Sequence, residues 1–105
     1  MATILFMSKI DNQKIHIETC VSQLPNFKTG DYILLDGFID NRYKELFEDV
    51  ACIINGNEEK LIYIFDRDYE FKINKIIWAD IDVIWVDIRL SQDSDIKIIS
   101  EIYDI

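Results

Sequence analysis

The chain has 105 residues, half of them apolar and 12% aromatic, which argues against intrinsic disorder and suits one compact domain spanning residues 1–105. Its 20 acids and 11 bases give a net charge of −9, which disfavours direct binding to nucleic acid or an anionic membrane and favours a basic protein partner. No stretch is long and apolar enough to span a bilayer, and no secretory signal is recognisable, so we expect a cytoplasmic protein.

Charge is unevenly distributed along the chain. Residues 1–30 carry two acids and three bases, whereas residues 31–105 carry 18 acids and eight bases. Three glycines and one proline leave no room for a flexible linker. Isoleucine occupies 21 positions and leucine seven, a bias toward pleated, half-buried surfaces.

The first part of the chain predicts strands. Residues 2–10 and residues 14–21 are joined at Asp11-Asn12, and the regular alternation of apolar and polar residues along the second segment predicts a hairpin. A loop follows over residues 22–31. The next apolar segment contains Asp36-Gly37, a pair that favours the tight turn of a second hairpin.

The middle of the chain contains one expected helix and the clearest hairpin. Apolar residues recur every three or four positions over residues 41–49, with Asp40 or Asn41 placed as the N-cap, which predicts a short helix. Two apolar runs within residues 50–65 flank Asn55-Gly56, the strongest short-range signal for a hairpin.

An apolar run over residues 75–90, KIIWADIDVIWVDIRL, contains both tryptophans and three aspartates. Asp80 and Asp82 occupy even positions, whereas Asp87 and Arg89 occupy odd ones. Successive side chains of a regular strand point to opposite faces, so one regular strand cannot place all four on the same face.

This change of parity predicts a β-bulge or a sharp bend near residues 84–86. In the strand before it, Ile81, Val83 and Trp85 are expected to face the core. Residues 96–105 are rich in isoleucine, which favours a closing strand, although Ile99 and Ile102 also have the spacing of a helix.

Together these elements predict a mainly β fold, an antiparallel barrel- or sandwich-like sheet of about seven strands with one short helix. A further turn near Arg67-Asp68 fits this interpretation. A strand-rich α+β sheet, with the helix over residues 41–49 packed on one face, is the alternative.

Eight carboxylates are the candidate residues for binding a partner. They lie in the expected helix, around the turn near residue 67 and in the apolar run. The candidates are Glu45, Glu48, Asp49, Asp66, Asp68, Glu70, Asp80 and Asp82. If they converge, ordered carboxylates could imitate phosphates and occupy the basic groove of a nucleic-acid-binding protein.

Neither a metal ion nor a cofactor is expected. Asp80 and Asp82 form a D-x-D pair, but no glycine-rich phosphate loop or βαβ pattern accompanies it. Residues 66–77 begin like a calcium loop, yet Phe71 stands where the glycine belongs and Ile77 where the glutamate belongs.

No catalytic arrangement is expected either. His16 is the one histidine, and on a strand it lies about 13 Å from Cys20, too far for proton transfer. Cys20 and Cys52 have no metal-binding spacing and are expected to be reduced thiols. The sequence therefore predicts a protein that is not an enzyme.

The favoured hypothesis is a small acidic binding protein that docks on a partner protein with a basic surface and masks it. Immunity proteins and phage-encoded inhibitors of host defence belong to this class of size and charge. The abundance of isoleucine, asparagine, lysine and tyrosine is typical of AT-rich bacterial or phage genes. A homo-oligomer is compatible with the sequence.

Two alternatives remain open. One is small-ligand binding by a barrel or sandwich whose pocket is lined by aromatic residues, although packing in the core is the competing interpretation of these side chains. The pocket candidates are Tyr63, Phe65, Tyr69, Phe71, Trp78 and Trp85. The other is an accessory subunit that associates through an exposed strand edge.

Overall fold

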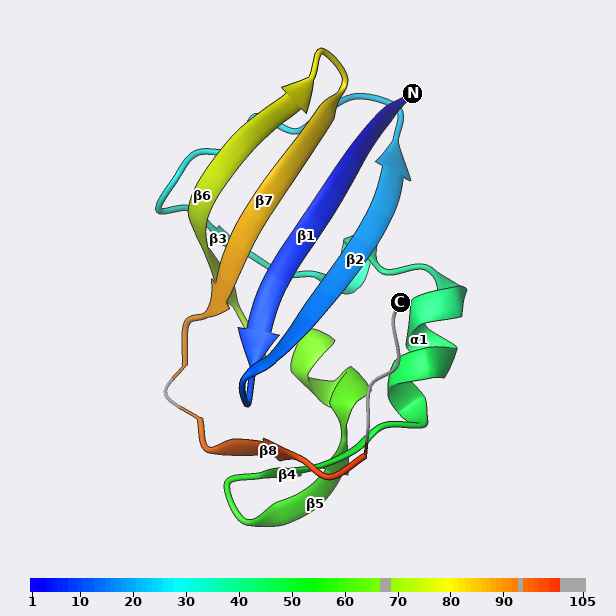
Figure 1. Cartoon of the computed structure of the whole chain (residues 1–105), viewed down its shortest axis with the longest axis vertical. Helices are drawn as coiled ribbons and strands as arrows, with labels where there is room; N and C mark the ends of the chain where they lie inside the picture. Colours follow the sequence, from blue (N-terminus) through cyan, green and yellow to red (C-terminus); the bar gives the residue numbers. More distant parts are fainter. Residues whose placement is uncertain (67–68, 93, 101–105) are drawn as a thin grey trace.

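The computed structural model describes residues 1–66, 69–92 and 94–100 (Figure 1). In chain order the elements are β1 (Ala2–Ile10), β2 (Gln13–Val21), β3 (Tyr32–Ile33), η1 (Asp36–Phe38), α1 (Asn41–Glu48), β4 (Ala51–Ile54), β5 (Asn57–Lys60), η2 (Leu61–Phe65), β6 (Phe71–Asp80), β7 (Val83–Leu90) and β8 (Ile96–Ile98). The Cα radius of gyration of 13.6 Å is the value expected for one compact domain of this length.

Five strands form a sheet in the order β2-β1-β7-β6-β3, which curls into a half-barrel (Figure 1). The predicted mainly β, barrel-like fold with one short helix is confirmed, with one addition. β1 and β7 pair in parallel, because β7 starts from the β6–β7 turn at the same end of the sheet where β1 starts. A smaller sheet, in the order β5-β4-β8, lies at the opposite end of the molecule (Figure 1).

Local signals placed three elements correctly. Asp11 and Asn12 have φ of 49° and 61°, as the tight turn of the β1–β2 hairpin requires, and Asn55 and Gly56 have φ of 50° and 86° between β4 and β5. The carboxylate of Asp40 accepts a hydrogen bond from the third residue of α1 and so caps the helix.

The expected hairpin at Asp36-Gly37 is wrong. These residues lie in the 3₁₀ helix η1, closed by a 2.9 Å hydrogen bond from the Phe38 N–H to the Leu35 carbonyl. Leu35 and Ile39 on either side are both buried. The tight turn buries both apolar side chains under the sheet, which the two arms of an exposed hairpin would not do.

The second apolar run of the β4–β5 segment is also not a strand beyond Lys60. Residues 61–65 form the 3₁₀ helix η2, in which Leu61, Ile64 and Phe65 are buried. A spacing of three residues matches the 3₁₀ repeat, in which side chains at i and i+3 share a face.

The bulge or sharp bend expected near residues 84–86 is wrong as well, because these residues lie inside the continuous strand β7. The run 75–90 reverses direction at Ile81-Asp82, and Ile81 is 87% exposed instead of facing the core. Residues 84–86 pair regularly with β1, while the register shifts lie in β6, around Asn74 and Ala79. The chain reversal, not a bulge, therefore separates Asp80 from Asp87 and Arg89.

The end of the chain is partly described. β8 confirms a strand over residues 96–98, whereas residues 101–105 and the turn expected at Arg67-Asp68 lie outside the described residues.

The core lies between the inner face of the five-stranded sheet and α1, η1 and η2. A row of stacked rings runs through it, with centroid distances of 6.1 Å between Tyr43 and Phe47, 4.9 Å between Phe47 and Phe65, and 5.7 Å between Phe65 and Phe71. The backbone N–H of Glu18 donates to the Tyr43 hydroxyl oxygen at 3.0 Å. This bond ties α1 to the outer edge of β2 and satisfies a backbone group of an edge strand.

Candidate functional site

Acidic residues from three elements line two neighbouring hollows beside the small sheet. One hollow, of about 460 Å³, contains residues from the end of α1 and from β5, and the other, of about 450 Å³, contains residues from the β4–β5 hairpin and the end of η2. The two share Glu59 and Tyr63. We call the combined region the acidic surface; its acidic and aromatic residues are Glu48, Asp49, Glu58, Glu59, Asp66, Tyr63 and Tyr69. Its lining also includes one base, Lys60, so the carboxylates outnumber the bases five to one.

Local folding explains why these carboxylates meet. α1 ends at Glu48, and the backbone N–H of Leu61 donates to the Val50 carbonyl at 2.9 Å, which holds the end of β5 against the start of β4. Because the β4–β5 hairpin closes in two residues, Glu58 and Glu59 lie directly beside the strand that follows the helix. Tyr63 projects from η2 between the two hollows and is 49% exposed.

Beneath this surface lies the buried thiol of Cys52, the register partner of Glu59. Burial, and secondarily the negative charge of Glu59, raises the pKa of the Cys52 thiol. The thiol is therefore protonated at neutral pH and is a poor nucleophile.

The eight predicted carboxylates do not share one surface. Glu48, Asp49 and Asp66 belong to the acidic surface, while Glu45 is exposed elsewhere on α1 and Glu70 is exposed just before β6. Asp68 lies outside the described residues.

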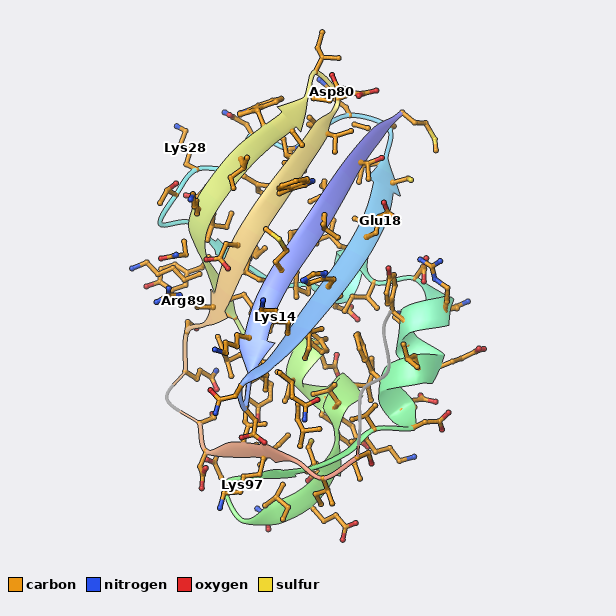
Figure 2. All side chains as sticks on the ribbon, viewed as in Figure 1. Lys14, Glu18, Lys28, Asp80, Arg89 and Lys97 are labelled. Atoms are coloured by element: carbon orange, nitrogen blue, oxygen red, sulfur yellow. The ribbon has the colours of Figure 1, made fainter. Side chains whose placement is uncertain are left out.

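The remaining two predicted carboxylates, Asp80 and Asp82, lie at the β6–β7 turn. This turn is at the opposite end of the long axis of the molecule, which is 41 Å long (Figure 2). Asp80 accepts a hydrogen bond from the Ile81 N–H at 2.7 Å, so its carboxylate supports the turn. No group of three or more histidine, cysteine, aspartate or glutamate residues that could hold a metal ion occurs among the described residues.

Glu58 and Glu59 were not among the predicted residues. The signal for them was present, because they follow the Asn55-Gly56 turn and lie one on each side of a short, charged strand. Their contribution to the acidic surface depends on the end of α1 lying beside β5, and the sequence of β5 alone does not show that neighbour.

The six aromatic candidates are divided among three places. Phe65 and Phe71 are buried and stack on each other in the core, as the competing interpretation holds. Tyr63 and Tyr69 line the polar hollow of the acidic surface. Trp78 and Trp85 lie on β6 and β7 with large exposed fractions, 66% and 42%.

The fold and its hollows together define a small, strand-rich domain with a tyrosine-containing acidic surface. No protein-family model, no curated protein and no solved structure matches this chain. Within the described residues, no helix combines the length and apolarity needed to cross a membrane.

Proposed function

We propose that this protein is a non-enzymatic binding protein that uses its acidic surface to dock on a basic region of a partner protein and mask it. Its role is that of an antagonist, of the kind represented by immunity proteins and phage-encoded inhibitors of host defence, acting in the cytoplasm of a bacterial cell. Its acidic side chains imitate the phosphates that the partner's basic groove normally receives.

The observation that carries the proposal is the convergence of Glu48, Asp49, Glu58, Glu59 and Asp66 around Tyr63. The carboxylates come from a helix end, a hairpin strand and the residue after η2, so the backbone fixes the positions from which the side chains project. A backbone that is ordered before binding does not have to be ordered by the partner, which favours affinity.

Tyr63 suits the centre of such an interface. A half-exposed tyrosine supplies a large rigid ring and a hydroxyl while losing little conformational entropy, and tyrosine is enriched among the residues that dominate binding energy. The acidic residues around it would steer a basic partner toward it and accelerate association at low salt.

The decisive experiment is affinity capture from native host lysate with three forms of the full chain: wild type, a Glu58→Gln/Glu59→Gln variant and an Asp80→Asn/Asp82→Asn variant. The last two lose the same charge at opposite ends of the molecule. We expect the wild type and the Asp80/Asp82 variant to retain the same basic protein, and the Glu58/Glu59 variant to lose most of it.

The captured protein is then purified, and its own activity is titrated with this chain. Stoichiometric inhibition, with an association rate that falls by at least tenfold between 10 and 150 mM NaCl, supports the proposal. An interaction insensitive to salt, or one lost only in the Asp80/Asp82 variant, contradicts it.

A further inference from the structure

The outer face of the five-stranded sheet carries a row of basic residues that crosses four strands. Lys14 on β2 and Lys9 on β1 are register partners, and so are Arg89 on β7 and Lys72 on β6. β1 and β7 are adjacent and pair in parallel up to the Met7–Asp87 pair, two residues before Lys9 and Arg89. With strands about 4.8 Å apart, the row spans about 14 Å.

All four side chains are exposed, and among the described residues none of them forms an ion pair. Like charges directly opposite each other on neighbouring strands destabilise a sheet. The two pairs bring four positive charges to one end of the sheet face, where Figure 2 shows Lys14 and Arg89.

A hollow of about 520 Å³ adjoins this row on the same face. Met7 and Ile77 form its apolar part. The rest of its lining includes the ammonium groups of Lys9, Lys14 and Lys75 and the imidazole of His16. The one carboxylate in its lining, Asp87, accepts a hydrogen bond from the Asn74 amide at 2.9 Å.

Beyond the hollow, the next row of the face runs from the exposed carboxylate of Glu18 on the edge strand β2 to three apolar side chains on β1, β7 and β6. Trp85 lies between its register partners Leu5 on β1 and Ile77 on β6, with 42% of its surface exposed. An exposed indole held between two aliphatic side chains on a rigid sheet is a stacking platform for an unpaired ring.

We propose that this outer sheet face, bounded by Lys9, Lys14, Lys72, Lys75 and Arg89 and carrying Trp85, is a binding site for single-stranded nucleic acid. The phosphates contact the basic row, and one base stacks on Trp85 while its neighbour covers the hollow. We call this region the basic sheet face.

Charge and shape select this occupant. A single strand alternates anionic groups with flat aromatic rings, which matches a cationic row beside an exposed indole, whereas an acidic peptide supplies the charges without the rings. A second copy of the chain, docking through its acidic surface, is the alternative occupant, and the test below distinguishes it from a single strand.

The net negative charge of the chain does not oppose this site as strongly as the sequence indicates. The fold gathers five of the eleven lysine and arginine residues on one sheet face, and the acidic surface is built from other elements, α1, β5 and η2. At physiological salt, exposed charges farther apart than about 8 Å are largely screened from each other.

The test is fluorescence anisotropy with a 15-nucleotide fluorescein-labelled oligodeoxythymidylate and the full chain. Neutralising four or five phosphates gives a slope of about −3 for log affinity against log salt concentration, so affinity should fall on the order of 100-fold between 50 and 200 mM NaCl. A Lys9→Gln/Lys14→Gln variant should lower the steepness of this slope by about 1.4.

A Lys28→Gln/Lys97→Gln variant is the matched control. It removes the same charge from two exposed lysines on a loop and on β8, away from the basic sheet face (Figure 2). It should leave the slope unchanged and alter affinity less than twofold.

Trp85→Leu tests the stacking contact. We expect binding to quench tryptophan fluorescence in the wild type and in Trp78→Leu, but not in Trp85→Leu, and we expect Trp85→Leu to weaken binding by tenfold or more. Trp78 suits the control because its register partner is the buried Ile84, so its parity is opposite to that of Trp85.

Circular dichroism confirms that each variant is folded. Four results overturn the proposal: no binding at 50 mM NaCl, equal losses in the two lysine variants, equally strong competition by polyglutamate, or a salt-sensitive dimer that masks Trp85. The Glu58→Gln/Glu59→Gln variant should bind the oligonucleotide like the wild type, so a failure here leaves the proposed function of the acidic surface standing.

Discussion

The acidic surface and the basic sheet face gather their charges in different ways. The acidic surface uses neighbours in sequence, Glu48 with Asp49 and Glu58 with Glu59, which a single turn and a helix end bring together. The basic sheet face uses residues that the register of four strands places in one row, although they lie in two distant parts of the chain. Charge counted along a sequence therefore reveals part of the first kind of surface and conceals the second.

The largest expected difference between the two regions is the loss of unfolding free energy when an aromatic residue is replaced by alanine. Phe47 is fully buried behind the acidic surface and stacks on Phe65, so Phe47→Ala should lower the free energy of unfolding by about 3–5 kcal/mol. Trp85→Ala on the basic sheet face should lower it by less, about 1–2 kcal/mol, because 42% of the surface of this side chain is already exposed in the folded protein. Urea denaturation measures both, and equal losses would mean that Trp85 is a structural residue.

The two cysteines sharpen the same contrast, because Cys20 is exposed on β2 while Cys52 is buried behind the acidic surface. Cys20 should react with Ellman's reagent at once, whereas Cys52 should react only as the protein opens, since burial raises its pKa and excludes the reagent. One thiol equivalent in the native protein and two in 6 M guanidinium is the expected result. A Cys20→Ser variant that still reacts rapidly would contradict it.

The Cys52 thiol also determines the direction in which the stability of the folded protein changes with pH. The pKa of Cys52 is higher in the folded protein than in the unfolded chain, so its contribution to stability is constant below the ordinary thiol value of about 8.5 and decreases as pH rises above it. A Cys52→Ala variant should lose that alkaline decrease, measured as the melting temperature between pH 7 and pH 10.

A smaller effect is expected where the helix of one region meets the sheet of the other. Tyr43→Phe removes the hydroxyl that accepts the Glu18 N–H, and it should cost about 1 kcal/mol of unfolding free energy. Amide hydrogen exchange at Glu18 should accelerate in the same variant while exchange at Ile84 in the sheet centre does not change. Unchanged exchange at Glu18 would show that α1 does not protect this edge.

The smallest effect concerns the basic row itself. Lys9→Glu replaces a like-charged cross-strand pair with an attractive one, so it should raise the unfolding free energy by a few tenths of a kcal/mol at low salt. The gain should vanish in 1 M NaCl, where the Debye length is about 3 Å. Lys28→Glu makes the same change of charge in a loop, and an equal gain there would mean that overall charge, not the row, is responsible.

Much of the fold was predictable because its signals are local. The Asn55-Gly56 turn and the cap at Asp40 each act within a few residues, and both elements formed as expected. The strand predicted over residues 61–65 is wrong because five consecutive apolar residues have no periodicity that distinguishes a strand from a 3₁₀ helix. The turn at Ile81-Asp82 was missed because it contains no glycine or proline, and because alternating aspartates in an apolar run also fit the exposed face of one continuous strand.

The candidate surfaces were predictable only in part for a related reason. Charge counting found Glu48, Asp49 and Asp66, but it could not link them to Glu59 across the hairpin. The bases were interpreted as scattered because Lys9 and Arg89 are 80 positions apart, and only the parallel pairing of β1 with β7 makes them neighbours.

The parallel pairing of β1 with β7 also determines when the sheet can form during synthesis on the ribosome. Thr3 pairs with Val83, so β1 is synthesised long before β7, its partner at the centre of the sheet, exists. Until β7 emerges, the β1–β2 hairpin has an unpaired edge and exposes the side chains of Ile4 and Phe6, which are later buried. The nascent chain therefore passes through an aggregation-prone stage, and its sheet closes late and slowly because the final contact spans most of the sequence.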